Sequence, residues 1–175
     1  MTYAIAQGIQ VSLDGNTWYK LSDHNRQPIN ITYTLIESTD RMANGTLRKF
    51  VVARKFVISA DWKDLPTLDS NLVDYNTKDN DHAHGGAWIK AFYEGNFGNP
   101  VYVKLIFANE GVVEDGIPNG VYVDSQHATG TESQVKQTFM STFTYNVTKR
   151  RLGPIINNQQ TGYDYVDLKI EFTEI

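Results

Sequence analysis

The stretch that decides the fold is YDYVDLKIEFTEI, residues 163–175, in which apolar and polar side chains alternate. One parity holds Val166, Leu168, Ile170 and Phe172, and the other holds Asp167, Lys169, Glu171 and Thr173. Successive side chains of a β-strand point to opposite faces of its sheet. The alternation therefore predicts a strand with one buried and one solvated face.

Two further segments show the same period of two. In residues 29–37, Ile29, Ile31, Tyr33 and Leu35 alternate with polar residues, which predicts a strand with one buried face. In residues 138–149, the residues predicted to share one face are Phe139, Phe143, Tyr145 and Val147. Both segments are therefore typical of strands that bury one face and leave the other in solvent.

A fourth strand is predicted over residues 47–60, after a hairpin turn at Asn44-Gly45, whose residues accept positive φ angles. This strand is longer than the usual five or six residues, so it is expected to bend, switch sheets or extend beyond the domain. Apolar side chains occupy both of its parities, including Val51 and Val57. A lone domain would expose too much of this surface, so we expect the chain to associate with itself here.

Only residues 86–95 show helical spacing. Trp88, Ile89, Phe92 and Tyr93 form one apolar stripe, which predicts packing against a sheet, with Gly95 as a left-handed stop. Long connections are expected over residues 61–86 and 108–136. The sequence thus predicts a single domain over residues 1–175 that is mainly β, a β-sandwich or barrel-like fold with one short flanking α-helix and long loops.

Composition excludes several classes of protein. The 175 residues include no cysteine, which rules out disulfides and thiolate metal sites. The net charge of −4 argues against a nucleic-acid clamp that relies on overall charge, so any contact with DNA has to be local or repulsive. Residues 1–13 do not resemble a signal peptide, and no apolar run is long enough to span a bilayer. We expect a protein made in the cytoplasm that does not enter a membrane.

No polar cluster has the spacing of a catalytic site or a metal site. Residues 78–86 include Asp79 and His82, but they lack the spacing of zinc or calcium ligands, which favours a solvated loop. The side chains of Ser22-Asp23-His24 point apart, which favours a polar turn over a catalytic triad. The short tract Lys149-Arg150-Arg151 favours a salt-bridged or solvated strand edge over a nucleic-acid patch. We therefore predict no enzyme, no catalytic residues and no cofactor or metal.

Several segments together resemble a family of bacteriophage tail proteins. They are residues 21–29 (LSDHNRQPI), 40–50 (DRMANGTLRKF), 59–66 (SADWKDLP), 88–94 (WIKAFYE) and 139–143 (FMSTF). The resemblance implies the tail tube (major tail) subunit of a long non-contractile tail, a virion protein that forms stacked hexameric rings around the passage for DNA. The implied partners are further copies of the chain, the terminator, tape measure and distal tail proteins, and DNA transiently in the lumen.

Two groups of residues follow from these expectations. The residues predicted at subunit interfaces are Val51, Val57, Trp62, Asp79 and His82. Asp167 and Glu171 are predicted to face the lumen, because an acidic or neutral wall does not hold DNA phosphates. Residues 69–85 carry little apolar surface and are expected to become ordered on assembly.

Two alternatives remain open. The same fold also suits a tail terminator, a connector or a baseplate ring. A carbohydrate-binding β-sandwich is the alternative from another class of protein, with Trp18, Trp62 or Trp88 as stacking platforms.

Overall fold

The computed structural model describes residues 8–69, 72, 83–108, 122–124 and 135–175. Within these ranges the chain forms β1 (Gly8–Ser12), β2 (Tyr19–Leu21), β3 (Asn30–Arg41), β4 (Leu47–Pro66), β5 (Ala83–His84), α1 (Gly86–Asn96), β6 (Val101–Ala108), β7 (Tyr122–Asp124), β8 (Lys136–Ile156) and β9 (Gln159–Glu174). The prediction of a mainly β fold with one short helix is confirmed for the described residues.

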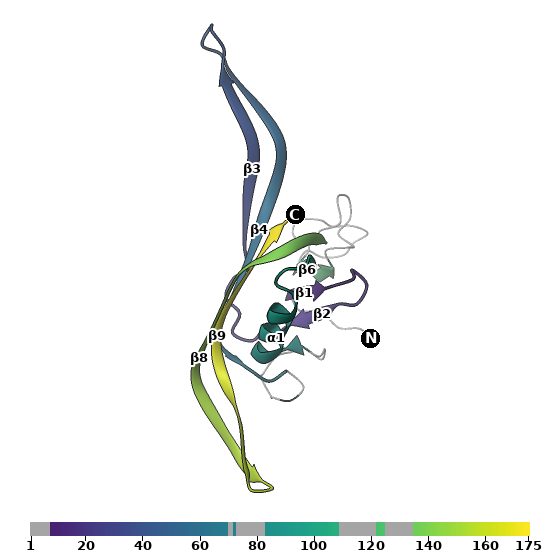
Figure 1. Cartoon of the computed structure of the whole chain (residues 1–175), viewed down its shortest axis with the longest axis vertical. Helices are drawn as coiled ribbons and strands as arrows, with labels where there is room; N and C mark the ends of the chain where they lie inside the picture. The colour runs from purple at the N-terminus through teal and green to yellow at the C-terminus, as the bar shows by residue number, and fades with distance from the viewer. Residues whose placement is uncertain (1–7, 70–71, 73–82, 109–121, 125–134) are drawn as a thin grey trace.

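These nine strands belong to one hydrogen-bonded sheet in the order β3-β4-β9-β8-β6-β1-β2-β5, with β7 paired to β6. Its larger half consists of the four long strands β3, β4, β9 and β8, each antiparallel to its neighbours (Figure 1). β9 is one of the two interior strands of this half, since it pairs with β4 on one side and with β8 on the other.

The sheet curves back on itself beyond β2. Gln27 donates its backbone N–H to the carbonyl oxygen of Asp61 at 2.8 Å, and Lys63 donates to the carbonyl oxygen of Asn25 at 3.2 Å. The segment after β2 therefore runs beside β4, which closes the smaller half of the sheet over the larger half. This closure gives the barrel-like form of the predicted architecture, built from one continuous sheet.

The core lies between the two halves of the sheet. Trp62 is only 1% exposed, and its indole Nε1 donates to the carbonyl oxygen of Ser22 at 2.7 Å. The apolar parity predicted for β9 is confirmed, because Val166, Leu168, Ile170 and Phe172 are all buried. The other strands and α1 contribute Ile9, Val11, Ile58, Leu65, Ile89, Phe92, Val101 and Val103.

α1 packs against β8 and β9 through the predicted apolar stripe. Ile89 and Phe92 are buried, and the ring of Tyr93 stacks on that of Phe143 with centroids 4.4 Å apart. The predicted stop at Gly95 is wrong. The helix continues to Asn96, and the next residue keeps a right-handed helical φ of −59°.

The predicted faces of β8 need one correction. Phe139 is exposed, whereas Met140 is buried, so Phe139 does not share a face with Phe143 and Tyr145. A bulge between Met140 and Thr142 inserts one extra residue and changes the parity, which a simple alternation rule does not detect.

The two predicted loops are shorter than expected. β4 continues to Pro66, and β7 lies within the second predicted connection. The expectation that residues 69–85 become ordered on assembly falls mostly on residues outside the described ranges.

Candidate assembly surface

Two hairpins extend beyond the shared part of the sheet. In the β3–β4 arm, residues 33–56, β4 pairs with β3 alone. In the β8–β9 arm, residues 150–164, β9 pairs with β8 alone. The two arms leave the sheet in opposite directions along the strand axis (Figure 1). The length predicted for residues 47–60 is therefore explained by extension beyond the body of the domain.

Each arm ends in a tight turn. In the β3–β4 arm, Gly45 has the predicted positive φ, +85°, whereas Asn44 does not; Oδ1 of Asn44 instead accepts the N–H of Thr46 at 3.0 Å. The β8–β9 arm turns at Asn157 and Asn158, with φ angles of +52° and +61°. Two consecutive positive φ angles in a two-residue loop define the type I′ hairpin turn that asparagine favours.

The arms carry large apolar side chains that are exposed in the single chain. On the β3–β4 arm these are Tyr33, Leu35, Ile36, Met42, Leu47, Phe50, Val51 and Val52, and on the β8–β9 arm Leu152, Ile155 and Ile156. Val52 alone is 77% exposed. The buried face predicted for residues 29–37 is therefore correct at Ile29 and Ile31, which are partly buried against the core, and wrong at Tyr33 and Leu35, which are exposed in the single chain. Contiguous apolar exposure of this kind marks an interaction surface.

The four-stranded half also ends in two open edges. Among the described residues, β3 pairs only with β4, and β8 beyond Thr138 pairs only with β9. An open edge presents unpaired backbone N–H and C=O groups, which readily pair with a strand of another chain.

The four-stranded half has a polar face opposite the core, defined by the parity of Asp167, Lys169 and Glu171 on β9. A hydrogen bond with Thr142, followed by the attraction of Lys169, lowers the pKa of Glu171; Nζ of Lys169 lies 3.2 Å from Oε1 of Glu171. Asp167 accepts the backbone N–H of Asp64 at 3.0 Å. Both carboxylates predicted to face the lumen therefore lie on this polar face.

The residues predicted at subunit interfaces are distributed over three environments. Val51 is exposed on the β3–β4 arm, and Val57 is half-buried in β4. Trp62 is instead a core residue, because the even-numbered side chains in this part of β4 point into the barrel rather than toward a neighbouring subunit. Asp79 and His82 lie outside the described residues.

The tryptophans give little support to carbohydrate stacking, because each ring is already engaged within the chain. Nζ of Lys104 lies 4.4 Å from the ring centroid of Trp18, and Trp62 is buried. Trp88 stacks on His84 and Phe92, with centroids 3.9 Å and 5.0 Å away.

The segment Ser22-Asp23-His24 forms the predicted polar turn, in which Ser22 Oγ accepts the backbone N–H of His24 at 3.1 Å. Burial lowers the pKa of His24.

In the described part of the chain, no three His, Asp or Glu residues stand close enough together to hold a metal ion. Most of residues 78–86 lie outside that part.

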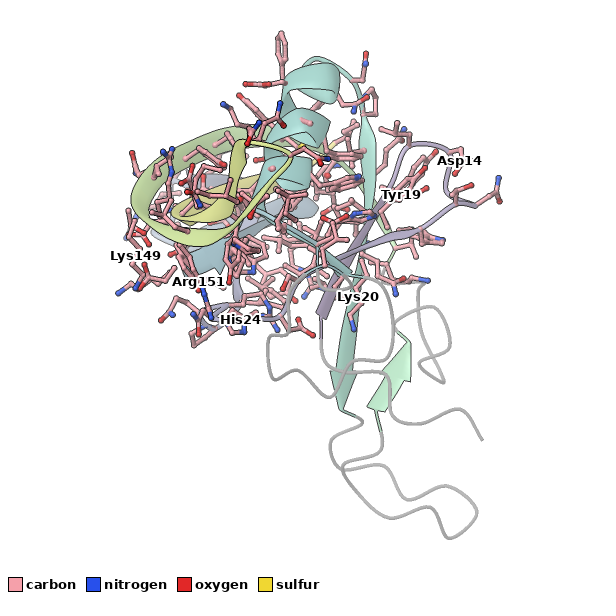
Figure 2. The ribbon with its side chains drawn as sticks, turned by 90° about the horizontal axis from the view of Figure 1, so that it is seen from below. Asp14, Tyr19, Lys20, His24, Lys149 and Arg151 are labelled. Carbon is pink, nitrogen blue, oxygen red and sulfur yellow. The ribbon has the colours of Figure 1, made fainter. Side chains whose placement is uncertain are left out.

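The basic tract of β8 lies on the opposite side of the molecule from Asp14, as Figure 2 shows for Lys149 and Arg151. Arg150 pairs with Asp164, with Nε 2.8 Å from Oδ1, and Nζ of Lys149 lies 3.5 Å from Oδ2 of Asp64. The prediction of a salt-bridged strand edge is confirmed for these two residues.

No model of a known protein family matches this sequence, and no curated protein matches it either. The one helix in the described ranges has 11 residues, and no helix there is long and apolar enough to cross a membrane. The features of this chain that bear on its function are therefore the two arms, the open strand edges and the polar face.

Proposed function

We propose that this chain is a virion structural protein, the tail tube subunit of a long non-contractile bacteriophage tail, which assembles into stacked hexameric rings around the passage for DNA. One observation carries the proposal: the four-stranded antiparallel half of the sheet has two open edges, uncovered apolar arms at both ends and a polar face opposite its core. The sixfold symmetry and the place in the virion come from the sequence resemblance.

The strand directions favour a ring. Since each of the four strands is antiparallel to its neighbour, the edge strands β3 and β8 run in opposite directions. Rotation about an axis parallel to the strands preserves these directions, so β8 of one copy meets β3 of the next as an antiparallel pair. This contact joins two different surfaces, and repeating it by a rotation that closes produces a ring.

The polar face suits the wall of a central channel. A continuous sheet formed by edge pairing has a core face and a polar face, and the core face is already covered by α1 and the smaller half of the sheet. The polar face, with Asp167 and Glu171, then lines the space inside the ring.

The opposed arms suit the stacking of rings. Each arm extends along the strand axis, one toward each end of the molecule, and each carries exposed apolar residues (Figure 1). A ring with apolar arms on both rims can bury them against a second ring, or against a terminator, tape measure or distal tail protein.

Negative-stain microscopy of the purified protein over a range of concentrations tests the proposal. We expect rings with a central hole that stack into tubes as the concentration rises. Single rings that never stack would favour a tail terminator, a connector or a baseplate ring. Monomers at every concentration would contradict all of these functions.

Cysteine cross-linking tests the edge contact, because the chain has no cysteine of its own. Thr32→Cys on β3 and Thr144→Cys on β8 are mixed as separate proteins and treated with a short bis-maleimide. We expect joined pairs of the two different variants. Asn16→Cys, in the exposed β1–β2 turn, is the control and should join to neither. Cross-links only between identical variants would indicate a twofold dimer and contradict the ring.

A further inference from the structure

Arg151 differs from the other two cations of its tract. Lys149 and Arg150 each pair with a carboxylate, whereas no carboxylate of the described residues lies within 4.0 Å of the guanidinium of Arg151. Its Nη1 instead donates to the hydroxyl of Tyr163 at 3.4 Å. Arg151 is therefore an exposed cation that keeps most of its hydrogen-bond donors available.

Arg151 belongs to a compact group of four side chains, here called the cation–tyrosine cluster: Lys149, Arg151, Tyr163 and Tyr165. The sheet register pairs Lys149 with Tyr165 and Arg151 with Tyr163. The two tyrosine hydroxyls lie 3.3 Å apart, and Nζ of Lys149 lies 5.2 Å from the ring centroid of Tyr165. All four side chains thus project from one face of the β8–β9 hairpin.

This face is the polar face that also carries Asp167 and Glu171. The bulges nearest to this part of the sheet add their extra residues to β4 and β8, so the alternation of β9 from Tyr163 to Glu171 is uninterrupted. Tyr163 and Tyr165 therefore have the parity of Asp167, and Asp64 links Asp167 to Lys149.

The tyrosines position the guanidinium for an anion. Hydrogen bonding and electrostatic interaction with Tyr165 and Tyr163 raise the pKa of Arg151. An arginine guanidinium is charged at neutral pH without any such shift. Arginine, lysine and tyrosine side chains are all common donors to phosphate oxygens, and a guanidinium can bind a phosphate through two N–H groups. Tyrosine and arginine are also common at protein–protein interfaces, so competition with polyglutamate is used to distinguish an acidic protein from a phosphate backbone.

We propose that the cation–tyrosine cluster binds the phosphate backbone of duplex nucleic acid, with Arg151 as the principal contact. Phosphate binding by the cluster does not depend on ring formation. Its placement in a channel does rest on the proposed function. In a ring, six clusters would line one end of the channel, so the wall would be cationic there and mixed in charge around Asp167 and Glu171.

Fluorescence anisotropy with a short labelled DNA duplex tests this binding, titrated with the full chain at about 50 mM and about 200 mM salt. Arg151→Gln should weaken binding about tenfold at low salt and reduce the salt slope by about one. Arg150→Gln is the matched control. This substitution removes the same charge from the adjacent residue, which points to the other face of the hairpin and pairs with Asp164. The Arg150→Gln variant should bind the duplex like the wild type. Circular dichroism checks that both variants are folded.

Equal weakening by both substitutions would mean that only net charge matters and would overturn the proposal, as would the absence of wild-type binding at low salt. Polyglutamate that displaces the duplex at equal charge concentration would overturn it in favour of an acidic protein partner. Ring formation is measured separately by mass photometry. If the wild type forms no rings but binds DNA in a manner that depends on Arg151, the tail tube function is refuted and the proposed function of the cluster stands.

Discussion

Val51→Asp is the substitution that tests most directly whether the β3–β4 arm is buried on assembly. Val51 is 55% exposed in the single chain. Since full burial of a valine contributes about 1.5 kcal/mol or more, covering the remaining surface is worth about 1 kcal/mol per contact. An unpaired carboxylate in the same place costs at least about 2 kcal/mol more. The combined penalty of about 3 kcal/mol weakens each contact by roughly a hundredfold.

The fold of the single chain should tolerate this change. Exposed substitutions usually alter the free energy of unfolding by about 0.5 kcal/mol, and the lower strand propensity of aspartate adds at most about 1 kcal/mol. Mass photometry over a concentration series measures assembly, and thermal unfolding followed by circular dichroism measures the fold.

Two control variants make the result specific. Leu13→Asp introduces the same charge at a side chain of similar exposure, 47%, between β1 and β2 and away from both arms. It should assemble like the wild type. Val51→Thr keeps the branched shape without a charge and should lose only part of the assembly. Assembly of Val51→Asp at wild-type concentrations would refute the burial of this arm.

Three further predictions concern the stability of the single chain. Hydrogen bonds from two backbone N–H groups of its own turn lower the pKa of Asp14 to about 2. The ionised carboxylate therefore stabilises the fold fully above the unfolded pKa of 3.8, and this contribution is lost as the pH falls through about 2. The difference in Tm between wild type and Asp14→Asn should narrow between pH 5 and pH 2, and a constant difference would contradict this. Gly85→Ala places a Cβ 2.2 Å from the carbonyl oxygen of Leu68 and should destabilise the chain by about 3 kcal/mol in urea unfolding; an unchanged midpoint would show that the backbone yields. Asn158→Val should lower the stability by about 1–2 kcal/mol because of the positive φ, whereas Asn158→Gly should not, and equal effects would rule out backbone strain as the cause.

The alternation of apolar and polar residues predicted the buried side chains correctly under two conditions. The strand pairing has to be regular, and the core face has to be covered by the same chain. β9 met both conditions, so its buried residues were predicted correctly. β8 failed at Phe139 because the bulge after Met140 changes the parity, and bulges have no simple sequence signature. In β3 the prediction was correct for Ile31, which packs against the core, and failed for Tyr33 and Leu35, which lie on the arm and are exposed in the single chain.

The β8–β9 arm was not predicted, because Gly153, Pro154 and Gly162 are residues that usually interrupt strands. In the structure, Gly153 and Pro154 lie at a bulge, and Gly162 has a φ of +158° and lies against Arg151, where a Cβ would be 2.4 Å from the Arg151 carbonyl oxygen. The sequence signal for this arm was the Asn-Asn pair at its tip. The cation–tyrosine cluster was likewise not predicted from the sequence, because its cations lie on β8 and its tyrosines on β9. Only the pairing register of the two strands brings these side chains together.

The interior position of β9 has a consequence for the order of folding. β9 follows both of its neighbours along the chain, and its pairing partners in β4 lie more than 90 residues earlier. Contacts so distant in sequence form slowly, because a long loop must close first. β8 and β9 form a local hairpin, so the slow step is its docking on β4. Until it docks, β4 and β9 each present a long unpaired side that can bind another nascent chain. Rapid synthesis at high temperature should therefore favour misfolded, insoluble protein, and slower synthesis in the cold should favour chains in which β9 reaches its place.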